Sequence, residues 1–177
     1  RIRMFLAVWA AILLVMAVAH PIWMAVEPQY TWADMAQAPA VLWHGLGMDL
    51  SMSAYLVAPV LLLTVVSIWV VRPWMSAALR IYLWTVSAII AVGYVLDAVL
   101  YPYWGFRLDV TPWFYFVTSP SSAMASLPWY AEVGVLALMA VLTLAIGLWM
   151  RLVVRRFGLP EQLCRPLRRR IWMTAVW

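Results

Sequence analysis

The chain has 177 residues, of which 67% are hydrophobic and 11% are charged, and its formal net charge is +5. Soluble proteins are close to half apolar and a quarter charged, so this composition excludes an ordinary soluble domain. All twelve positive charges are arginine. They gather between apolar runs, where membrane topology explains them without a nucleic-acid partner.

Four apolar runs are long enough to cross a bilayer, for which about 20 residues suffice. They cover residues 5–26, 50–71, 81–100 and 130–150. Because lipid offers no hydrogen-bond partners to the backbone, we expect each run to be a helix. The predicted fold class is therefore an all-α polytopic membrane protein with four complete transmembrane helices.

Proline and polar residues shape the first two runs. The first contains His20-Pro21, where we expect the helix to kink or end because proline lacks a backbone donor. Residues 28–39 have the pattern of a loop with one short helix. Pro59 lies inside the second span, where neighbouring helices can satisfy the carbonyl that it frees.

The longest stretch outside the spans, residues 101–126, follows the third span. Within it, Ser119-Pro120 predicts a helix start, because serine is a favoured cap and proline fits the first helical position. We expect a short interfacial helix over residues 123–127, lying along the membrane surface before the fourth span.

Three consecutive arginines and an apolar run end the chain. This pattern predicts the start of a fifth span near residue 171. We expect the rest of that span to follow residue 177, so that whatever comes next is extracytoplasmic.

The arginines alternate in number along the chain. Two precede the first span, none lies in the first connection, two lie in the second, one lies in the third and seven follow the fourth span. By the positive-inside rule, the N-terminus is cytoplasmic and segments 42–55 and 101–126 face outward. We expect a multi-pass protein of the cytoplasmic membrane whose partners include membrane lipids, since the arginine-rich connection attracts anionic headgroups.

Two short sequence patterns stand out in the outward segments. The first is Leu42-Trp43-His44-Gly45-Leu46 followed by Asp49-Leu50-Ser51, and the second is Gly105-Phe106-Arg107-Leu108-Asp109 with Tyr115 and Thr118-Ser119-Pro120. Together they resemble the N-terminal membrane domain of the lipoteichoic acid synthase-like proteins, bacterial membrane enzymes of the sulfatase and alkaline-phosphatase superfamily. The sequence departs from that family at Gly47, where a basic residue is expected, and at Ser121-Ser122, where a charged pair is common.

The resemblance implies five membrane helices and an extracytoplasmic catalytic domain after the fifth. The implied reaction moves a phosphate-linked headgroup, such as glycerol phosphate or phosphoethanolamine, from a membrane lipid to a cell-surface glycan. It also implies that the catalytic residues and a divalent metal (Mn, Mg or Zn) belong to that downstream domain. None of them maps onto this chain, for which no cofactor is expected. The alternative is a self-contained membrane module, either a small transporter or a redox subunit.

Arg107 with Asp109 is the first candidate site. An arginine can bind a lipid phosphate through two parallel hydrogen bonds, and Trp104 would hold the segment at headgroup depth. The other interpretation is a local Arg–Asp pair that stiffens the loop without a ligand.

The other candidates are isolated polar residues near the outward ends of the spans. His44 and Asp49 are further candidates for binding the lipid headgroup. They are five residues apart and point about 140° apart on a helix, so structural hydrogen bonds are favoured over a shared metal or proton relay. Asp97 and Glu132 are candidates because acids inside a membrane are often functional, although both lie close enough to water to be structural. His20 with His44 as haem ligands is a minor alternative.

Overall fold

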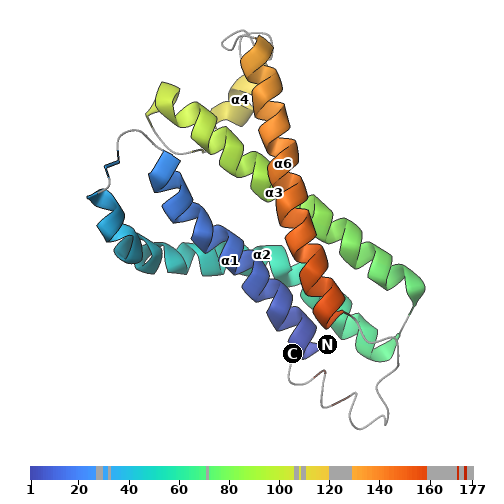
Figure 1. Ribbon diagram of the computed structural model, residues 1–177. Helices are drawn as coiled ribbons and strands as arrows, with labels where there is room; N and C mark the ends of the chain where they lie inside the picture. The colour runs from blue at the N-terminus through green and yellow to red at the C-terminus, as the bar shows by residue number, and fades with distance from the viewer. Residues whose placement is uncertain are drawn as a thin grey trace. The chain divides into compact units, whose positions relative to one another are not determined.

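The computed structural model describes residues 1–26, 30–31, 33–70, 72–105, 108, 111–119, 129–158, 171 and 174. Over these residues the regular elements are helices, and no strand occurs among them (Figure 1). They are α1 (Ile2–Val26), the 3₁₀ helix η1 (Asp34–Gln37), α2 (Ala38–Trp69), α3 (Pro73–Trp104), α4 (Thr111–Thr118) and α6 (Trp129–Phe157).

Four of these helices are long and apolar enough to cross a membrane, which confirms the four predicted spans. They are α1, α2, α3 and α6. Helices α1, α3 and α6 each contain a predicted span within longer bounds, whereas α2 starts earlier than the predicted span 50–71 and ends at Trp69, two residues before it. At 1.5 Å per residue, the 32 residues of α2 reach about 48 Å, which exceeds the roughly 30 Å of a hydrocarbon core. Helix α2 is therefore longer than one crossing requires.

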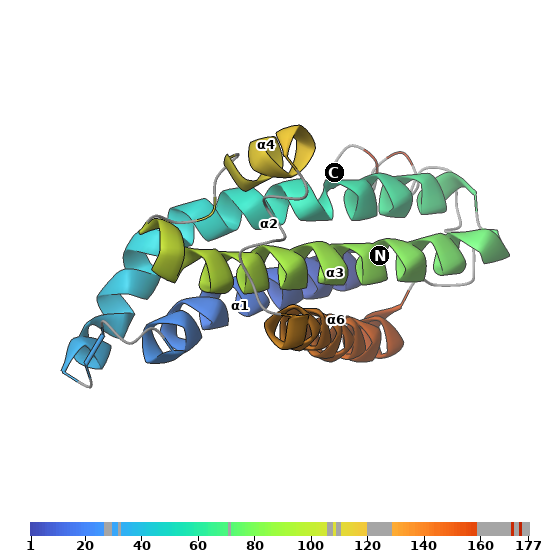
Figure 2. The same ribbon diagram turned by 90° about the horizontal axis from the view of Figure 1, so that it is seen from above.

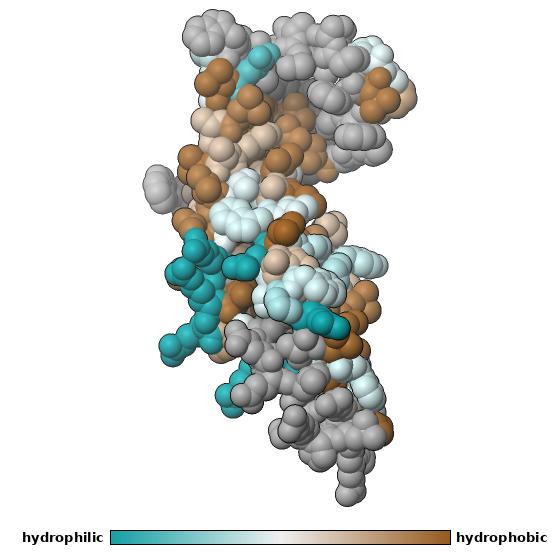
Figure 3. Space-filling model, turned by 90° about the vertical axis from the view of Figure 1, so that its right-hand side faces the viewer, coloured by the Kyte–Doolittle hydropathy of each residue, from teal (hydrophilic) through white to brown (hydrophobic). Residues whose placement is uncertain are grey.

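Apolar side chains also cover the surface, as expected for helices that face lipid. Ile81 is 68% exposed and Leu136 is 65% exposed. Figure 3 shows one face of the molecule, on which apolar side chains, drawn in brown, are widely spread. A soluble protein rarely exposes large contiguous apolar patches, so this surface agrees with the composition.

Of the kink or end expected at His20-Pro21, the end is wrong, because α1 continues through Pro21 to Val26. Proline removes one backbone donor. In a membrane, however, no water is available to hydrogen-bond to backbone groups that leave the helix, so the remaining helical hydrogen bonds are retained. The expected short helix before the second span is η1. Helix α2 then begins at Ala38 with Pro39 in its first turn, where proline is well tolerated.

The long segment after the third span contains a helix that was not predicted from the sequence. Helix α4 covers Thr111–Thr118 and has a proline, Pro112, at its second residue. The predicted surface helix over residues 123–127 lies outside the described residues. The predicted start of the fifth span also lies outside them, apart from Ile171 and Thr174.

The chain forms two compact units. One contains residues 1–86 and 147–177, and the other contains residues 87–146. In the first unit α1 and α2 run antiparallel and share three polar contacts: Arg1 with Ser67, Trp9 with Ser53, and His20 with Asp49. The face of α2 that is buried in the structure repeats every three or four residues, as helix packing requires (Asp49, Ser53, Val57, Val60, Thr64, Ser67 and Ile68).

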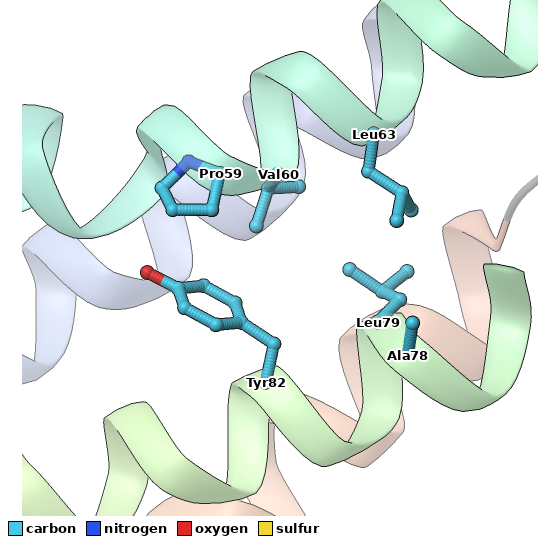
Figure 4. Close-up of a pocket in the computed structure, with 6 residues that line it drawn as sticks. All are labelled: Pro59, Val60, Leu63, Ala78, Leu79 and Tyr82. Atoms are coloured by element: carbon cyan, nitrogen blue, oxygen red, sulfur yellow. The ribbon is translucent and has the colours of Figure 1, made fainter.

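The C-terminal part of α2 and the first turns of α3 lie side by side (Figure 2). The Tyr82 hydroxyl donates a 2.7 Å hydrogen bond to the Leu56 carbonyl, three residues before Pro59. Pro59, Val60, Leu63, Ala78, Leu79 and Tyr82 line a small apolar pocket of about 140 Å³ between these helices (Figure 4). Pro59 frees the carbonyl of Tyr55, four residues earlier, so the neighbouring helix donates to the carbonyl next to the freed one.

Candidate functional site

A histidine–carboxylate pair joins α1 to α2. The Nε2 atom of His20 lies 3.0 Å from one carboxylate oxygen of Asp49 and 3.2 Å from the other. The side chains are 23% and 9% exposed, so the pair is largely shielded from solvent. An ionised carboxylate can only accept, so in this contact the N–H at Nε2 of His20 is the donor.

A glycine makes room for this histidine. A Cβ atom added to Gly45 would lie 3.0 Å from Nε2 of His20, which is tighter than ordinary contact. A Cβ at Gly47, two residues further along the same helix, would meet nothing within 4 Å. Gly45 therefore lets the imidazole approach the backbone of α2, one helical turn before Asp49.

His44 belongs to a different part of the same helix. It is exposed, and its Nδ1 lies 2.7 Å from the Ala40 carbonyl, to which it donates. The partner of Asp49 is therefore His20, and His44 is held by its own helix. Two ionisable residues near the same expected end of consecutive spans were the sequence signal for this pair, but spacing alone could not show that they meet.

A second polar contact lies in the unit of residues 87–146. Asp97 is only 5% exposed, and its Oδ1 accepts a 2.6 Å hydrogen bond from the backbone N–H of Leu108. Gly105 lies between them in the chain, with a φ of +71° that favours glycine, and its N–H donates to the Tyr101 carbonyl at 2.8 Å. An acid inside a membrane-length helix therefore binds the backbone of the following loop.

The remaining predicted site residues are placed as follows. Glu132 lies in the first turn of α6, where the helix dipole favours a negative charge, and it is partly exposed. Arg107 and Asp109 lie outside the described residues, as does the side chain of Trp104. Leu108, between Arg107 and Asp109, is described and is the residue bound by Asp97.

Neither polar contact has the residues of a metal centre. Among the described residues, no group of three or more His, Cys, Asp or Glu side chains comes together in a way that could hold a metal ion. For the haem alternative, Nε2 of His20 is engaged by Asp49, and Nδ1 of His44 is engaged by a carbonyl. Both imidazoles thus have structural hydrogen bonds that explain their presence.

No family model, no curated protein and no solved structure matches this chain. The resemblance noted in the sequence therefore depends on its two short patterns alone. Five residues of those patterns take part in the contacts described above: His44, Gly45, Asp49, Gly105 and Leu108.

Proposed function

We propose that this chain is the membrane domain of a sulfatase-like enzyme that transfers a phosphate-linked headgroup from a membrane lipid to a cell-surface glycan. In this proposal the domain anchors the enzyme and presents the lipid, and catalysis with a divalent metal takes place in a downstream extracytoplasmic domain. The headgroup is glycerol phosphate or phosphoethanolamine. The membrane is the bacterial cytoplasmic membrane, with the N-terminus inside.

The single observation that carries the proposal is the contact between Asp97 and Leu108. It binds the loop that contains the Gly105–Asp109 pattern to a membrane-length helix. A loop held there lies where the apolar core of a bilayer gives way to headgroups. The arginine of that loop, Arg107, is our candidate for binding the lipid phosphate, since guanidinium and phosphate form paired charge-assisted hydrogen bonds.

The hydrogen bonds of the buried hydroxyls in α2 favour an anchoring role over the alternative of a small transporter. A transporter would need a polar pathway, and Ser53, Thr64 and Ser67 are the buried hydroxyls of α2. Each donates to a carbonyl of its own helix three residues back. Their protons are thus used within α2, and Val57 and Val60 interrupt the polar face. Such hydroxyls stabilise helix packing in membranes.

The test compares two donors with the intact gene product. We expect Arg107→Ala to impair transfer from a phospholipid in vesicles while leaving reaction with a water-soluble p-nitrophenyl ester of the same headgroup nearly unchanged. Arg80→Ala is the matched control, because Arg80 lies near the opposite expected end of α3 and is exposed. Equal loss with both donors would rule out a headgroup role for Arg107.

A further inference from the structure

The apolar pocket between α2 and α3 is open on one side and closed on the other (Figure 4). Two of the residues that line it, Val60 and Leu79, are buried and close its inner side. On the other side, Pro59 is exposed and Tyr82 is half-buried. The pocket therefore faces whatever surrounds these two helices.

No polar group in the wall of the pocket needs water. By residue type, the hydroxyl of Tyr82 is the one polar side-chain group of the lining, and it already donates to the Leu56 carbonyl at 2.7 Å. An apolar cavity of about 150 Å³ stays dry and can bind a small apolar molecule. Around helices of membrane length, the apolar material at hand is the acyl chain of a lipid.

The pocket continues toward the beginning of α3 along one side of that helix. Tyr82, Ala78 and Trp74 are spaced by four residues, so their side chains follow one another on the same side. Trp74 is 59% exposed, in the first turn, and tryptophan is enriched at membrane interfaces. Pro73 and Tyr82 are about 14 Å apart along the axis, close to the roughly 15 Å of one leaflet. An acyl chain in this groove would reach from the headgroups to the middle of the bilayer.

A free guanidinium lies at the headgroup end of the groove. Arg72 directly precedes α3, and its carbonyl accepts the Met75 N–H at 3.1 Å, so its backbone is fixed to the first turn. Its exposed side chain makes no hydrogen bond or ion pair with any residue that the structure describes. Residues 50–96 contain no Asp or Glu, so no acid of these two helices near the groove neutralises it. A lipid phosphate would do so through paired hydrogen bonds.

We propose that the groove between α2 and α3 binds one phospholipid of net negative charge, with an acyl chain in the pocket and the phosphate at Arg72. An exposed arginine or tryptophan at the end of a span is common by itself. Here both stand at the end of an apolar groove that is one leaflet long. The groove lies at the beginning of α3, whereas Arg107 follows its end, so this lipid is not the proposed donor and the inference does not depend on the proposed function.

The test uses the intact gene product in nanodiscs of phosphatidylcholine with a small fraction of phosphatidylglycerol that carries a photoreactive diazirine in the middle of one acyl chain. After illumination, mass spectrometry should find the label concentrated in residues 59–66 and 74–82. Unlabelled phosphatidylglycerol should compete for this labelling, and additional phosphatidylcholine should not.

Two variants test the acyl-chain end of the groove. Ala78→Leu fills the pocket and should reduce labelling there about tenfold, because the chain loses its packing contacts. Ala54→Leu is the matched control. Ala54 is exposed and lies nine residues before Leu63, which places it on the opposite side of α2, so labelling of the groove should be unchanged.

Two further variants test the headgroup end. Arg72→Ala should weaken the competition by phosphatidylglycerol about fivefold, the effect of one exposed charge-assisted contact. Arg80→Ala removes the same charge from the same helix and should have no effect. Arg80 is exposed and lies two residues after Ala78, on another side of α3. Because Arg72 is exposed as well, its variant should fold even if Ala78→Leu does not.

Three results would overturn the proposal. Labelling that is equal on the exposed sides of all four long helices and indifferent to Ala78→Leu would show only lipid that surrounds the protein. Equal competition by phosphatidylcholine and phosphatidylglycerol, unchanged in Arg72→Ala, would show that no phosphate is recognised. Absence of label together with crosslinks between two copies of the chain would show that a second copy covers the groove.

Discussion

His20 and Asp49 are 29 residues apart in the sequence, but Nε2 of His20 lies 3.0 Å from a carboxylate oxygen of Asp49 and this contact joins α1 to α2. Arg1 with Ser67 and Trp9 with Ser53 make further contacts between the same two helices. Polar contacts of this kind stabilise helix pairs where lipid removes most of the hydrophobic driving force. The pair thus has a structural role that needs no ligand.

We expect His20 and Asp49 to be energetically coupled. A double-mutant cycle with His20→Ala and Asp49→Ala should give a coupling energy of about 0.6 to 1.7 kcal/mol, the range found for hydrogen bonds between membrane helices. Unfolding in mixed micelles measures it. The control cycle pairs His20→Ala with Asp34→Ala, whose carboxylate binds Thr31 instead, and should be additive. Additivity in the first cycle would mean that the pair contributes nothing.

Gly45 should be intolerant of a side chain while Gly47 tolerates one. Gly45→Ala places a Cβ 3.0 Å from the His20 ring and should lower the free energy of unfolding by about 1 kcal/mol, because the ring must shift away from Asp49. Gly47→Ala meets nothing within 4 Å and should be neutral or stabilising, since alanine favours the helix. The comparison uses the same unfolding measurement. An equal response of the two variants would contradict the close contact at Gly45.

The four spans could be predicted because lipid forces a long apolar run to satisfy its own backbone, so composition and length decide the outcome. Contacts between helices depend instead on how the helices pack against each other. Helical spacing disfavours His44 as the partner of Asp49, but nothing in the local sequence identifies His20, because that choice depends on how α1 packs against α2. The contact between Asp97 and Leu108 likewise depends on a backbone turn at Gly105.

Two local predictions failed for reasons that the structure makes clear. Pro21 was expected to kink or end α1, and the helix does not end there. One missing backbone donor does not end a helix in lipid, because no water is present to bind the other backbone groups. Helix α4 was missed although Thr111-Pro112 has the same start signal that was noted at Ser119-Pro120.

Gly147 should be the glycine of α6 that cannot be replaced. An added Cβ there would overlap the indole ring of Trp84, whereas a Cβ at Gly134 on the same helix would meet nothing within 4 Å. We expect Gly147→Ala to destabilise the protein by about 1 to 3 kcal/mol, as overpacking does, and Gly134→Ala to be nearly neutral. Unfolding in mixed micelles distinguishes them. A neutral Gly147→Ala would show that Trp84 does not pack against α6 at this point.

Tyr82 should stabilise the packing of α2 against α3 through its hydroxyl. Tyr82→Phe removes only the 2.7 Å hydrogen bond to the Leu56 carbonyl and should lower the free energy of unfolding by about 1 kcal/mol. Tyr55→Phe is the matched control, because Tyr55 is 77% exposed and should be insensitive to the same change. If the two variants unfold alike, the Leu56 carbonyl does not depend on Tyr82.

The central claim is that this chain serves an enzyme that takes its headgroup from a membrane lipid. The most direct measurement supplies the intact gene product with Mn²⁺, a cell-surface glycan as acceptor and vesicles of phosphatidylglycerol or phosphatidylethanolamine, and follows diacylglycerol. Transfer breaks the bond between phosphorus and the diacylglycerol oxygen, so the proposal predicts diacylglycerol from one of the two lipids, in amounts matching the headgroup gained by the acceptor. No diacylglycerol from either lipid would contradict it.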